Sequence, residues 1–524
     1  MAQEIAPRRA WLGLAVLVLP TLLVAMDITA LFLALPQISE DLGASGTEQL
    51  WITDGYGFLM AGFVITMGTL GDRIGRRRLL LVGGTAFAIL SVVSAYSVNP
   101  QMLIAARALL GVAGATLMPS TLALITNMFP DDRRRGRAIA IWATCQFAGG
   151  ALGPVLAGLL LRWFWWGSVF LVAVPVMVAL LVLGPVLLPE FRSPARGRLD
   201  LLSVGLSLAA VLPAVYGLKR LAVDASDGTL VPVAAIVGGV VVGVVFVRRQ
   251  LALSEPLLDL RLLRNRSFAA VLVGLVFAGV AMAGTGLMAT QYLQGVLGHS
   301  PLASAVLFAP MGLGVAAGTM TAPLLARRMR PASAIAAGLC LSVVGCVLVT
   351  RVDGTDGLPW LIAGVAVLAL GTGPLFALGT GLVVGSVPPQ RAGAAAAMSE
   401  TSNYFGSSLG MAVLGVVGAA VYRSRMADAP DAARQTLAGA DAVARDLPGV
   451  QGEALLRTAH DAFTSGLHVT GAISAVVFAA LALLIRATRP TEPSDKGAAG
   501  AQPAAERAAA WGTPASPSGG SGSV

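Results

Sequence analysis

Four charged residues lie inside stretches that are otherwise apolar: Asp27, Asp54, Arg107 and Glu400. A charge at the centre of a bilayer costs at least about 2.5–3.5 kcal/mol, so charges kept there mark functional sites by default. A carboxylate in a low-dielectric site can hold a proton near neutral pH. A cation that arrives beside it favours the ionised form and expels the proton. These acids therefore predict that a proton and a cation exclude one another, which is the minimum requirement for exchanging the two.

The composition places these residues in a membrane. Of the 524 residues, 56% are hydrophobic, 12% charged and 6% aromatic, whereas a soluble globular protein carries about 25% charged residues. The cysteines Cys145, Cys340 and Cys346 fall within apolar stretches, which indicates no disulfide framework. The composition excludes a soluble globular fold, a disordered chain and a disulfide-rich secreted scaffold, and it predicts a polytopic membrane protein.

Fourteen stretches are long and apolar enough to cross a bilayer, which takes about 20 residues of helix. They lie at 11–35, 51–70, 79–98, 101–125, 138–160, 165–188, 201–218, 230–247, 268–293, 301–325, 332–350, 359–386, 394–421 and 465–485. We therefore expect an all-α polytopic membrane protein with 14 transmembrane helices, arranged as two six-helix bundles plus a two-helix insertion.

This arrangement divides the chain into successive segments. They are a cytoplasmic N-terminus (1–10), an N-terminal six-helix bundle (11–188), an inserted helix pair (189–247), a cytoplasmic linker (248–267), a C-terminal six-helix bundle (268–485) and a tail (486–524). The tail is rich in Pro, Ala, Ser and Gly, which predicts disorder. The long outer loop 422–464 has a composition that favours a short amphipathic helix. The inserted pair carries no intramembrane charge, so we expect it to lie outside the transport path.

The basic residues set the orientation. If the N-terminus is inside, the cytoplasmic segments hold 26 of the 36 Lys and Arg residues, as the positive-inside rule requires. An even number of spans then places both termini in the cytoplasm. The net charge of +9 is explained by this topology, so it predicts no nucleic-acid partner.

Depth along the helices groups the charged residues, at about 1.5 Å of rise per residue. By this rise Asp27, Asp54 and Arg107 lie about 12, 5 and 9 Å below the outer face of the first bundle. Arg107 can pair with Asp27 or with Asp54, and Asp54 can also be an interfacial residue in contact with water. Glu400 lies in the inner half of the second bundle.

Other residues inside the spans are candidates for a substrate cavity, because aromatic faces attract lipophilic cations. They are Trp142, Gln146, Phe147, Gln291, Tyr292, Asn403 and Tyr404. The alternative for each of them is ordinary packing or an interfacial position.

Two glycine-containing segments carry the remaining candidates. The loop GDRIGRRR contributes Gly71, Asp72, Arg73, Gly75 and Arg76. Its glycines permit a tight turn, and its aspartate can pair with neighbouring arginines near a helix start. The segment GGALGPVLAG contributes Gly149, Gly153, Pro154 and Gly158. Its glycines allow close helix packing and its proline removes a backbone hydrogen bond. We expect a packed, kinked gate against a helix of the other bundle, with simple packing as the alternative.

Several motifs together resemble the major facilitator superfamily. The loop at 71–78 is similar to the signature loop of that family, the helix segment ARALLGVAGA (106–115) to its arginine motif, and the segment at 149–158 to its antiporter motif. MDITALFLALP (26–36) and EPLLDLRLL (255–263) resemble the 14-helix drug:proton antiporters. LWITDGYGFLMAG (50–62), LMPSTLALI (117–125) and AAAAMSETSNYFG (394–406) are similar to exporters of quaternary ammonium compounds and ethidium. The resemblance covers about residues 10–486.

The resemblance implies roles for these residues. It assigns cation recognition or protonation to Asp27 and Asp54, and proton coupling to Glu400. It implies that Asp72 and its neighbouring arginines latch the two halves on the cytoplasmic side. The chain departs from exporters of divalent cations in this group, because the stretch 301–325 holds no acid and Tyr404 stands where a further acid can occur. Monovalent lipophilic cations therefore fit better than bulky dications.

The function expected is proton-coupled export of lipophilic, mainly monovalent cationic drugs and dyes, driven by the proton gradient and without a cofactor. The alternative is a dedicated natural-product exporter. The chain has 34 Arg against 2 Lys, a bias that indicates a high-GC organism, and such exporters occur in organisms of this kind. The partners expected are lipophilic cations or antibiotics, protons and lipid, for a monomer in a bacterial cell membrane. The chain has no G-x-x-x-x-G-K-[ST] loop, and its three histidines have no metal-ligand spacing, so we expect neither an ATP-driven pump, an enzyme nor a metal site.

Overall fold

The structure is a computed structural model that describes residues 7–44, 46–191, 200–223, 230–253, 256, 260–354, 356–387 and 392–488. All regular elements in this part of the chain are helices. The tail expected to be disordered and residues 1–6 lie outside the described residues, apart from 486–488. The N-terminal segment 1–10 is helical from Pro7 onward, because α1 begins there.

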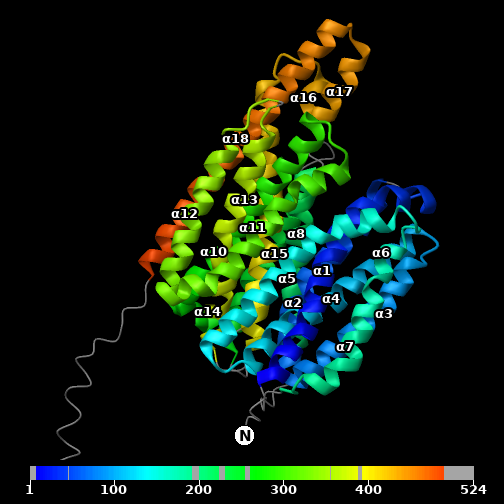
Figure 1. Ribbon diagram of the computed structural model, residues 1–524. Coiled ribbons are helices and arrows are strands. Elements are labelled where there is room, and N and C mark those ends of the chain that lie inside the picture. Colours follow the sequence, from blue (N-terminus) through cyan, green and yellow to red (C-terminus); the bar gives the residue numbers. More distant parts are fainter. Residues whose placement is uncertain are drawn as a thin grey trace, which may run out of the picture.

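Among the described residues, seven helices form the first bundle, and nine elements form the transmembrane part of the second. The first contains α1 (Pro7–Leu42), α2 (Gly46–Ile74), α3 (Arg76–Ala95), α4 (Pro100–Met128), α5 (Asp132–Leu160), α6 (Ser168–Leu171) and α7 (Ala173–Leu187). The second contains α10 (Arg266–Gln291), η2 (Tyr292–Val296), α11 (Pro301–Arg328), α12 (Pro331–Val349), α13 (Leu358–Pro374), η3 (Leu375–Gly379), α14 (Thr380–Gly385) and α15 (Ala392–Arg425), and is completed by α18 (Gly449–Ala487). Figure 1 shows the blue-to-cyan helices of the first bundle beside the green-to-red helices of the second.

Polar caps begin several of the long helices. Asn99, Asp131 and Ser300 precede α4, α5 and α11, and each side chain accepts a hydrogen bond from a backbone N–H in the first turn. Asn265 does the same for α10. A cap of this kind satisfies one of the backbone donors that a helix start leaves without a partner. The helix starts are therefore local properties of the sequence.

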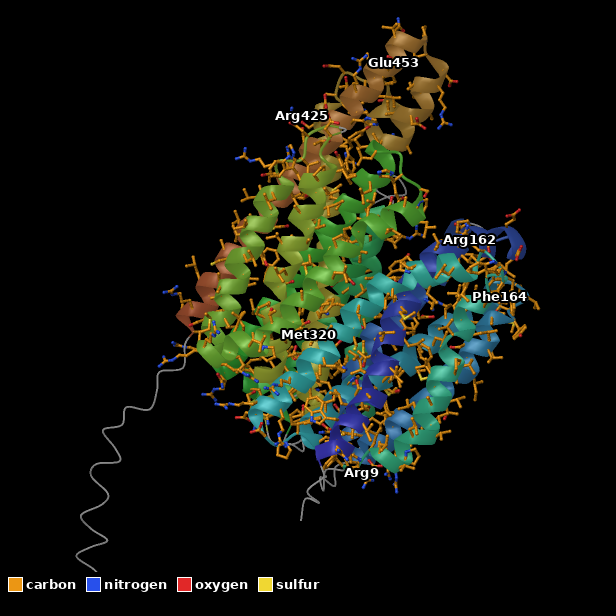
Figure 2. All side chains as sticks on the ribbon, viewed as in Figure 1. Arg9, Arg162, Phe164, Met320, Arg425 and Glu453 are labelled. Atoms are coloured by element: carbon orange, nitrogen blue, oxygen red, sulfur yellow. The ribbon has the colours of Figure 1, made fainter. Side chains whose placement is uncertain are left out.

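Twelve helices of the described part are long and apolar enough to cross a membrane. They include α9 (Leu230–Ala252), whose outward valines Val237, Val240 and Val241 are each more than half exposed. Such exposure suits lipid, since acyl chains rather than water cover these faces. Figure 2 places Arg9 at one end of the molecule and Arg162, Arg425 and Glu453 at the other. The chain is a multi-pass, all-α membrane protein. The two remaining expected spans, 51–70 and 201–218, lie in α2 and α8 (Leu201–Val223).

The segment 422–464 is more helical than the sequence suggests. α15 continues to Arg425, and α16 (Asp431–Gln435), α17 (Leu437–Asp446) and the first part of α18 follow. Figure 1 shows α16 and α17 beyond the ends of the neighbouring helices. The hydroxyl of Tyr422 donates to the carbonyl of Ala433 at 2.9 Å, and Thr436 caps α17. These local hydrogen bonds and buried alanines stabilise a packed group of helices where a loop was expected. The segment therefore contains more helix than the one short amphipathic helix that its composition predicts.

The helices α8 and α9 form a hairpin that is clipped at one end. The carboxylate of Asp200 accepts bonds from the backbone and hydroxyl of Ser203 and from the Arg249 guanidinium, whose Nη2 lies 2.7 Å away. The Ser203 hydroxyl bond, followed by Arg249, lowers the pKa of Asp200 below its usual 3.8. The linker expected at 248–267 begins later than expected, because Arg248 and Arg249 belong to α9.

The hairpin contacts both bundles. α8 packs against α2 of the first bundle and α15 of the second. The rings of Tyr216 and Trp51 stack with centroids 6.4 Å apart, and a Cβ added at Gly62 would lie 3.0 Å from Leu212. The hairpin is therefore packed across the boundary between α2 and α15.

Candidate transport site

A buried ion pair joins α1 and α4. Nη1 of Arg107 lies 2.5 Å from Oδ2 of Asp27, and the two side chains are 1% and 8% exposed. Nε of Arg107 also donates to the carbonyl of Ile52 at 3.3 Å. Of the two partners that the sequence leaves open for Arg107, the structure shows Asp27. Asp54 belongs to α2, but its side chain lies outside the described residues.

Two aromatic rings enclose the guanidinium of Arg107. Its Cζ lies 4.7 Å from the ring centroid of Tyr56 and 5.8 Å from that of Phe170. Cation–π contacts of this kind strengthen when they are desolvated. Arg107 is therefore held by a carboxylate, a carbonyl and two rings, which compensates part of the cost of burying its charge.

Glu400 lies in a small cavity between the two bundles. Its Oε2 accepts a hydrogen bond from the Gln146 amide at 3.2 Å, and the residue is 4% exposed. The cavity is small, and residues of both bundles line it. They are Trp142, Ala143, Gln146 and Phe147 of α5, Leu275 of α10, Phe376 of η3, Thr380 of α14, and Ser399, Glu400 and Asn403 of α15. The cavity therefore draws its walls from both bundles, and three of its side chains are aromatic.

The structure divides the predicted cavity residues into two groups. Trp142, Gln146, Phe147 and Asn403 line the cavity, and Tyr404 packs against the core beside it. Gln291 and Tyr292 lie elsewhere. Gln291 is exposed near the end of α10, and Tyr292 is buried and donates its hydroxyl to the carbonyl of Gly354.

Gln291 and Tyr292 differ from the other candidates because of where α10 ends. The helix continues into the π-helical turn η2, which packs in a second core cluster with Val352 and Leu361. The positions of Gln291 and Tyr292 in an apolar stretch could not show that they lie away from the cavity, because this depends on how α10 ends.

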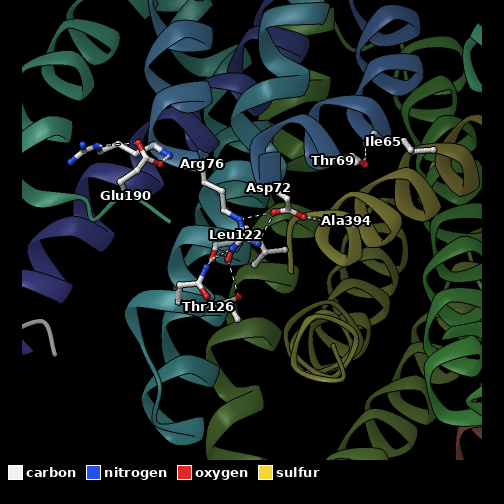
Figure 3. Close-up of polar contacts among 11 residues, drawn as sticks. Ile65, Thr69, Asp72, Arg76, Leu122, Thr126, Glu190 and Ala394 are labelled. Carbon is white, nitrogen blue, oxygen red and sulfur yellow. Dashed lines mark hydrogen bonds and ion pairs between the residues drawn. The ribbon is translucent and has the colours of Figure 1, made fainter. Parts of the chain in front are cut away.

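The C-terminal end of α2 bridges the bundles through Asp72. Oδ1 of Asp72 accepts from Nε of Arg76 at 2.7 Å, and Oδ2 accepts from the backbone N–H of Ala394 at 3.2 Å. Figure 3 shows Asp72 between Arg76 and the first turn of α15. A carboxylate at a helix N-terminus is favoured by the free N–H groups and the helix dipole. Asp72 therefore holds α15 of the second bundle against α2 of the first.

A second acid holds the start of α3. Gly75 has φ +110°, and a Cβ added there would lie 2.6 Å from Oε1 of Glu190. That oxygen accepts from the backbone N–H of Arg77 at 3.1 Å. Gly75 thus makes the turn and leaves room for the carboxylate. Gly71 is part of the helix α2, with Leu79 3.2 Å from its Cβ position, so the expected turn uses one of the two glycines. Arg73 ends α2.

The glycines of α5 face mainly α1, which belongs to the same bundle. A Cβ added at Gly149 would lie 2.2 Å from the carbonyl oxygen of Leu22, and one at Gly153 would lie 2.1 Å from Oγ1 of Thr29. Gly158 lies near both bundles, with Leu302 at 3.0 Å and Leu33 at 3.2 Å. The expected contact with the other bundle is therefore made at Gly158 but not at Gly149 or Gly153. Pro154 lies within the continuous helix α5.

Direct polar contact between α5 and α11 involves residues that the sequence did not single out. The hydroxyls of Thr144 and Thr319 lie 2.7 Å apart, and the Cβ position of Gly312 is 2.7 Å from Ala151. These contacts run along the seam between the two helices. Threonine in an apolar helix is a weak signal, because its hydroxyl usually bonds its own backbone.

Sequence analysis also missed Tyr56, Phe170, Glu190 and Phe376. Tyr56 and Phe170 contact Arg107, and Phe376 faces Phe147 with ring centroids 4.8 Å apart. The position of Tyr56, two residues after Asp54 in an apolar stretch, was a usable signal. The others become neighbours of the site only through helix packing. Among the described residues, no group of three or more His, Cys, Asp and Glu side chains could hold a metal ion.

Two helical bundles with a polar cavity at their interface are the architecture of a secondary transporter. The family model of the Major Facilitator Superfamily matches residues 17–411, so the chain belongs to the Major Facilitator Superfamily. It is a membrane transporter and not an enzyme. The sequence-based resemblance to this family is confirmed.

Relatives match over most of the chain. The multidrug efflux pump LfrA of Mycolicibacterium smegmatis is 42% identical over 487 residues, covering 91% of this chain and 96% of the relative. The methyl viologen resistance protein SmvA of Salmonella typhimurium is 33% identical, covering 87% and 93%. The tetracenomycin C resistance and export protein of Streptomyces glaucescens is 32% identical, covering 91% and 92%. The crystal structure of the human organic anion transporter MFSD10 matches with a TM-score of 0.58 at 16% identity, covering 90% and 100%.

Proposed function

We propose that this transporter exports lipophilic, mainly monovalent cationic drugs and dyes in exchange for protons. The observation that carries the proposal is the Glu400 carboxylate, which lies between the two bundles in a cavity with three aromatic walls. A cation and a proton compete for such a carboxylate, and aromatic faces bind lipophilic cations. The similarity to the multidrug efflux pump LfrA supports export of several substrates.

The charge of the described site favours monovalent cations. Asp27 and Asp72 are both paired with arginines, whereas the hydrogen-bond partner of Glu400 is the neutral amide of Gln146. Glu400 is therefore the described buried acid whose charge a substrate would balance. One carboxylate balances one positive charge, so a dication would carry an uncompensated charge into a low-dielectric site.

The proposal includes the topology. Fourteen helices cross the membrane, with α2 and α8 added to the twelve apolar helices, and both termini face the cytoplasm. The arginines of the α2–α3 loop and of the start of α5 support this orientation by the positive-inside rule. The protein acts as a monomer in a bacterial cell membrane, without a cofactor. The proton gradient drives the cycle, and protons enter through Asp27, Asp54 and Glu400.

The test uses inverted membrane vesicles with an imposed pH gradient and ethidium as the substrate. The wild type should accumulate ethidium only while the gradient is present, and Glu400→Gln should lose this uptake by a factor of about 100 or more, the usual weight of a positioned proton-transfer group. Glu453→Gln is the matched control, because the side chain of Glu453 is exposed near the start of α18, away from the cavity. Ethidium movement that ignores the gradient in the wild type would overturn the proposal.

A second candidate is a dedicated exporter of one natural product. The similarity to the puromycin resistance protein of Streptomyces alboniger and to the tetracenomycin C exporter, at 32% identity each, favours it. A susceptibility panel on cells with and without the protein separates the two. Protection against several unrelated cations supports the multidrug exporter, and protection against one compound supports the dedicated one.

A further inference from the structure

A hydrogen bond inside the cavity crosses from the first bundle to the second. The side-chain amide of Gln146 on α5 donates to Oε2 of Glu400 on α15 at 3.2 Å. Glu400 is 4% exposed, and among the described residues that line the cavity it alone is ionisable. A hydrogen bond that a charged carboxylate accepts is roughly twice as strong as one between neutral groups. The amide therefore stabilises the ionised form of Glu400 while the bundles are arranged as in this structure.

Each partner of this bond is fixed to its own bundle. On α5, Nε1 of Trp142 donates to the Thr121 hydroxyl of α4 at 3.0 Å, and this contact is buried. On α15, a Cβ added at Gly406 would lie 2.1 Å from the carbonyl oxygen of Val276, so α15 packs closely against α10. When the bundles rock, the amide moves with the first bundle and the carboxylate with the second. The bond between them therefore has to break.

An aromatic pair crosses the same boundary one residue further along α5. The ring centroids of Phe147 and Phe376 lie 4.8 Å apart, with an angle of 50° between the ring planes. Phe376 belongs to the π-helical turn η3, which packs against α10, α11 and α12 of the second bundle. Apolar rings beside a polar bond keep the local dielectric low, which strengthens the bond. Gln146 and Phe147 thus connect α5 to the second bundle at one point.

An exchanger has to prevent its binding site from changing sides while the site is empty. If the ionised, unoccupied carboxylate could do so, it would take up another proton and carry it across. Protons would then flow without any export of substrate. The protonated site and the cation-bound site must both cross, so the interaction that blocks the empty site has to differ between these states.

We infer that the Gln146 amide is a lock that holds the bundles in place while Glu400 is ionised and unoccupied. A proton on Glu400 removes the charge that makes the bond strong, and a cation beside the carboxylate takes the place of the amide. Either occupant weakens the bond and lets the bundles rock. Of the other ionisable groups described near the site, Asp27 and Arg107 compensate one another, and the phenol of Tyr404 stays protonated near neutral pH. Gln146 is thus a positioning residue that acts through Glu400.

This inference rests on the proposed function, because such a lock matters only if protons drive transport. Its test uses purified protein reconstituted into vesicles that enclose a pH-sensitive dye. The first assay imposes a pH gradient without any substrate and follows the proton leak. The second is ethidium counterflow without a gradient, in which ethidium exchanges for ethidium and no net proton moves.

Gln146→Met is the test variant, because methionine keeps the length of the side chain and removes its N–H donor. It should raise the substrate-free proton leak by about tenfold or more, the factor that a hydrogen bond to a charged group supplies. The KM for ethidium counterflow should stay within about a factor of two of the wild-type value, which also shows that the variant is folded. Gln146→Asn draws the same amide back by one methylene and should leak as well. In Gln146→Met/Glu400→Gln the leak should return to the wild-type level, since no carboxylate remains in the cavity to carry the proton.

Gln101→Met is the matched control. The Gln101 amide also donates to a carboxylate, that of Glu48, at 2.7 Å. This bond is exposed and joins α4 to α2 within the first bundle. Its loss should leave the proton leak unchanged.

Three results would overturn the lock. A leak in Gln146→Met no larger than in the wild type would mean that the amide only lines the cavity. A leak that persists in the double variant would mean that protons cross through damaged packing and not on Glu400. An equal leak in Gln101→Met would remove the role of the boundary between the bundles. These outcomes differ from failure of the proposed function, which shows as wild-type ethidium uptake that does not respond to the gradient.

Discussion

The buried ion pair of Asp27 and Arg107 illustrates how single residues are constrained in this molecule. Both side chains are almost fully enclosed, and the mutual attraction of such a pair roughly offsets the cost of taking two charges out of water. The pair is therefore a weak source of net stability. Removing one partner has a larger effect, because the charge of the other partner would remain buried and uncompensated.

We predict that Asp27→Asn destabilises the protein by about 3–5 kcal/mol, because it leaves a buried guanidinium unpaired. The double variant Asp27→Asn/Arg107→Gln should recover most of this loss, while gradient-driven transport stays absent in both. Unfolding in detergent titrations measures the stability. Arg445→Gln is the control, because its ion pair with Asp441 is largely exposed and should contribute at most about 1 kcal/mol. Equal stability of the single and double variants would contradict the pairing.

Helix α5 shows how an element positions the site. One side of it carries Trp142, Gln146 and Phe147 into the cavity, and another side presents Gly149 and Gly153 to α1. Close approach of two backbones requires residues without side chains at the contact. The glycines thus set the distance between α1, which carries Asp27, and α5, which carries Gln146.

We predict that Gly153→Ala destabilises the protein by about 1–3 kcal/mol, the usual cost of overpacking. The new Cβ would lie 2.1 Å from Oγ1 of Thr29 and 2.7 Å from the carbonyl oxygen of Met26, so α1 has to move. Gly150→Ala is a matched control on the same helix, since nothing lies within 4 Å of its Cβ position. Thermal unfolding of the purified variants measures both. If Gly150→Ala destabilised the protein as much as Gly153→Ala, the glycines would matter for the flexibility of the helix and not for its packing against α1.

Polar contacts between described residues join the two bundles of the molecule. Asp72 bonds to the first turn of α15 at Ala394, and Thr144 of α5 meets Thr319 of α11. Alternating access requires such contacts to break and reform as the bundles rock. We therefore expect Asp72 to stabilise the arrangement of the bundles described here relative to any other.

We predict that Asp72→Asn shifts the molecule away from the arrangement described here by about tenfold, since a hydrogen bond to a charged group contributes about 1.5–3 kcal/mol. A cysteine placed at the cavity residue Ser399 reports the shift. It should react faster with a polar thiol reagent added from the side of the α2–α3 loop, once the native cysteines are replaced by serine. Asp131→Asn is the control, because the Asp131 carboxylate caps α5 by accepting from the backbone N–H of Arg134 in the same helix. An unchanged reaction rate in Asp72→Asn would show that the bond across the bundles has no influence on their arrangement.

Much of the architecture followed from local properties. Apolar length predicted the helices, because a backbone in lipid must satisfy its hydrogen bonds within each segment. The cost of intramembrane charge identified Asp27, Arg107 and Glu400 without any knowledge of packing. The segment 422–464 was the weakest part of the prediction, since its helices depend on contacts with one another and not on apolar length.

What the sequence by itself determined was which apolar segments form long helices and which charged residues those segments hold, because both follow from the cost of moving each residue from water to lipid. Only the tertiary structure decided which groups meet. It paired Arg107 with Asp27, tied Gln146 to Glu400 and left the Tyr56 hydroxyl without a partner. It also placed Gln291 and Tyr292 away from the cavity. These outcomes depend on the rotation and ending of each helix against its neighbours, and the apolar pattern of a lipid-embedded helix constrains neither.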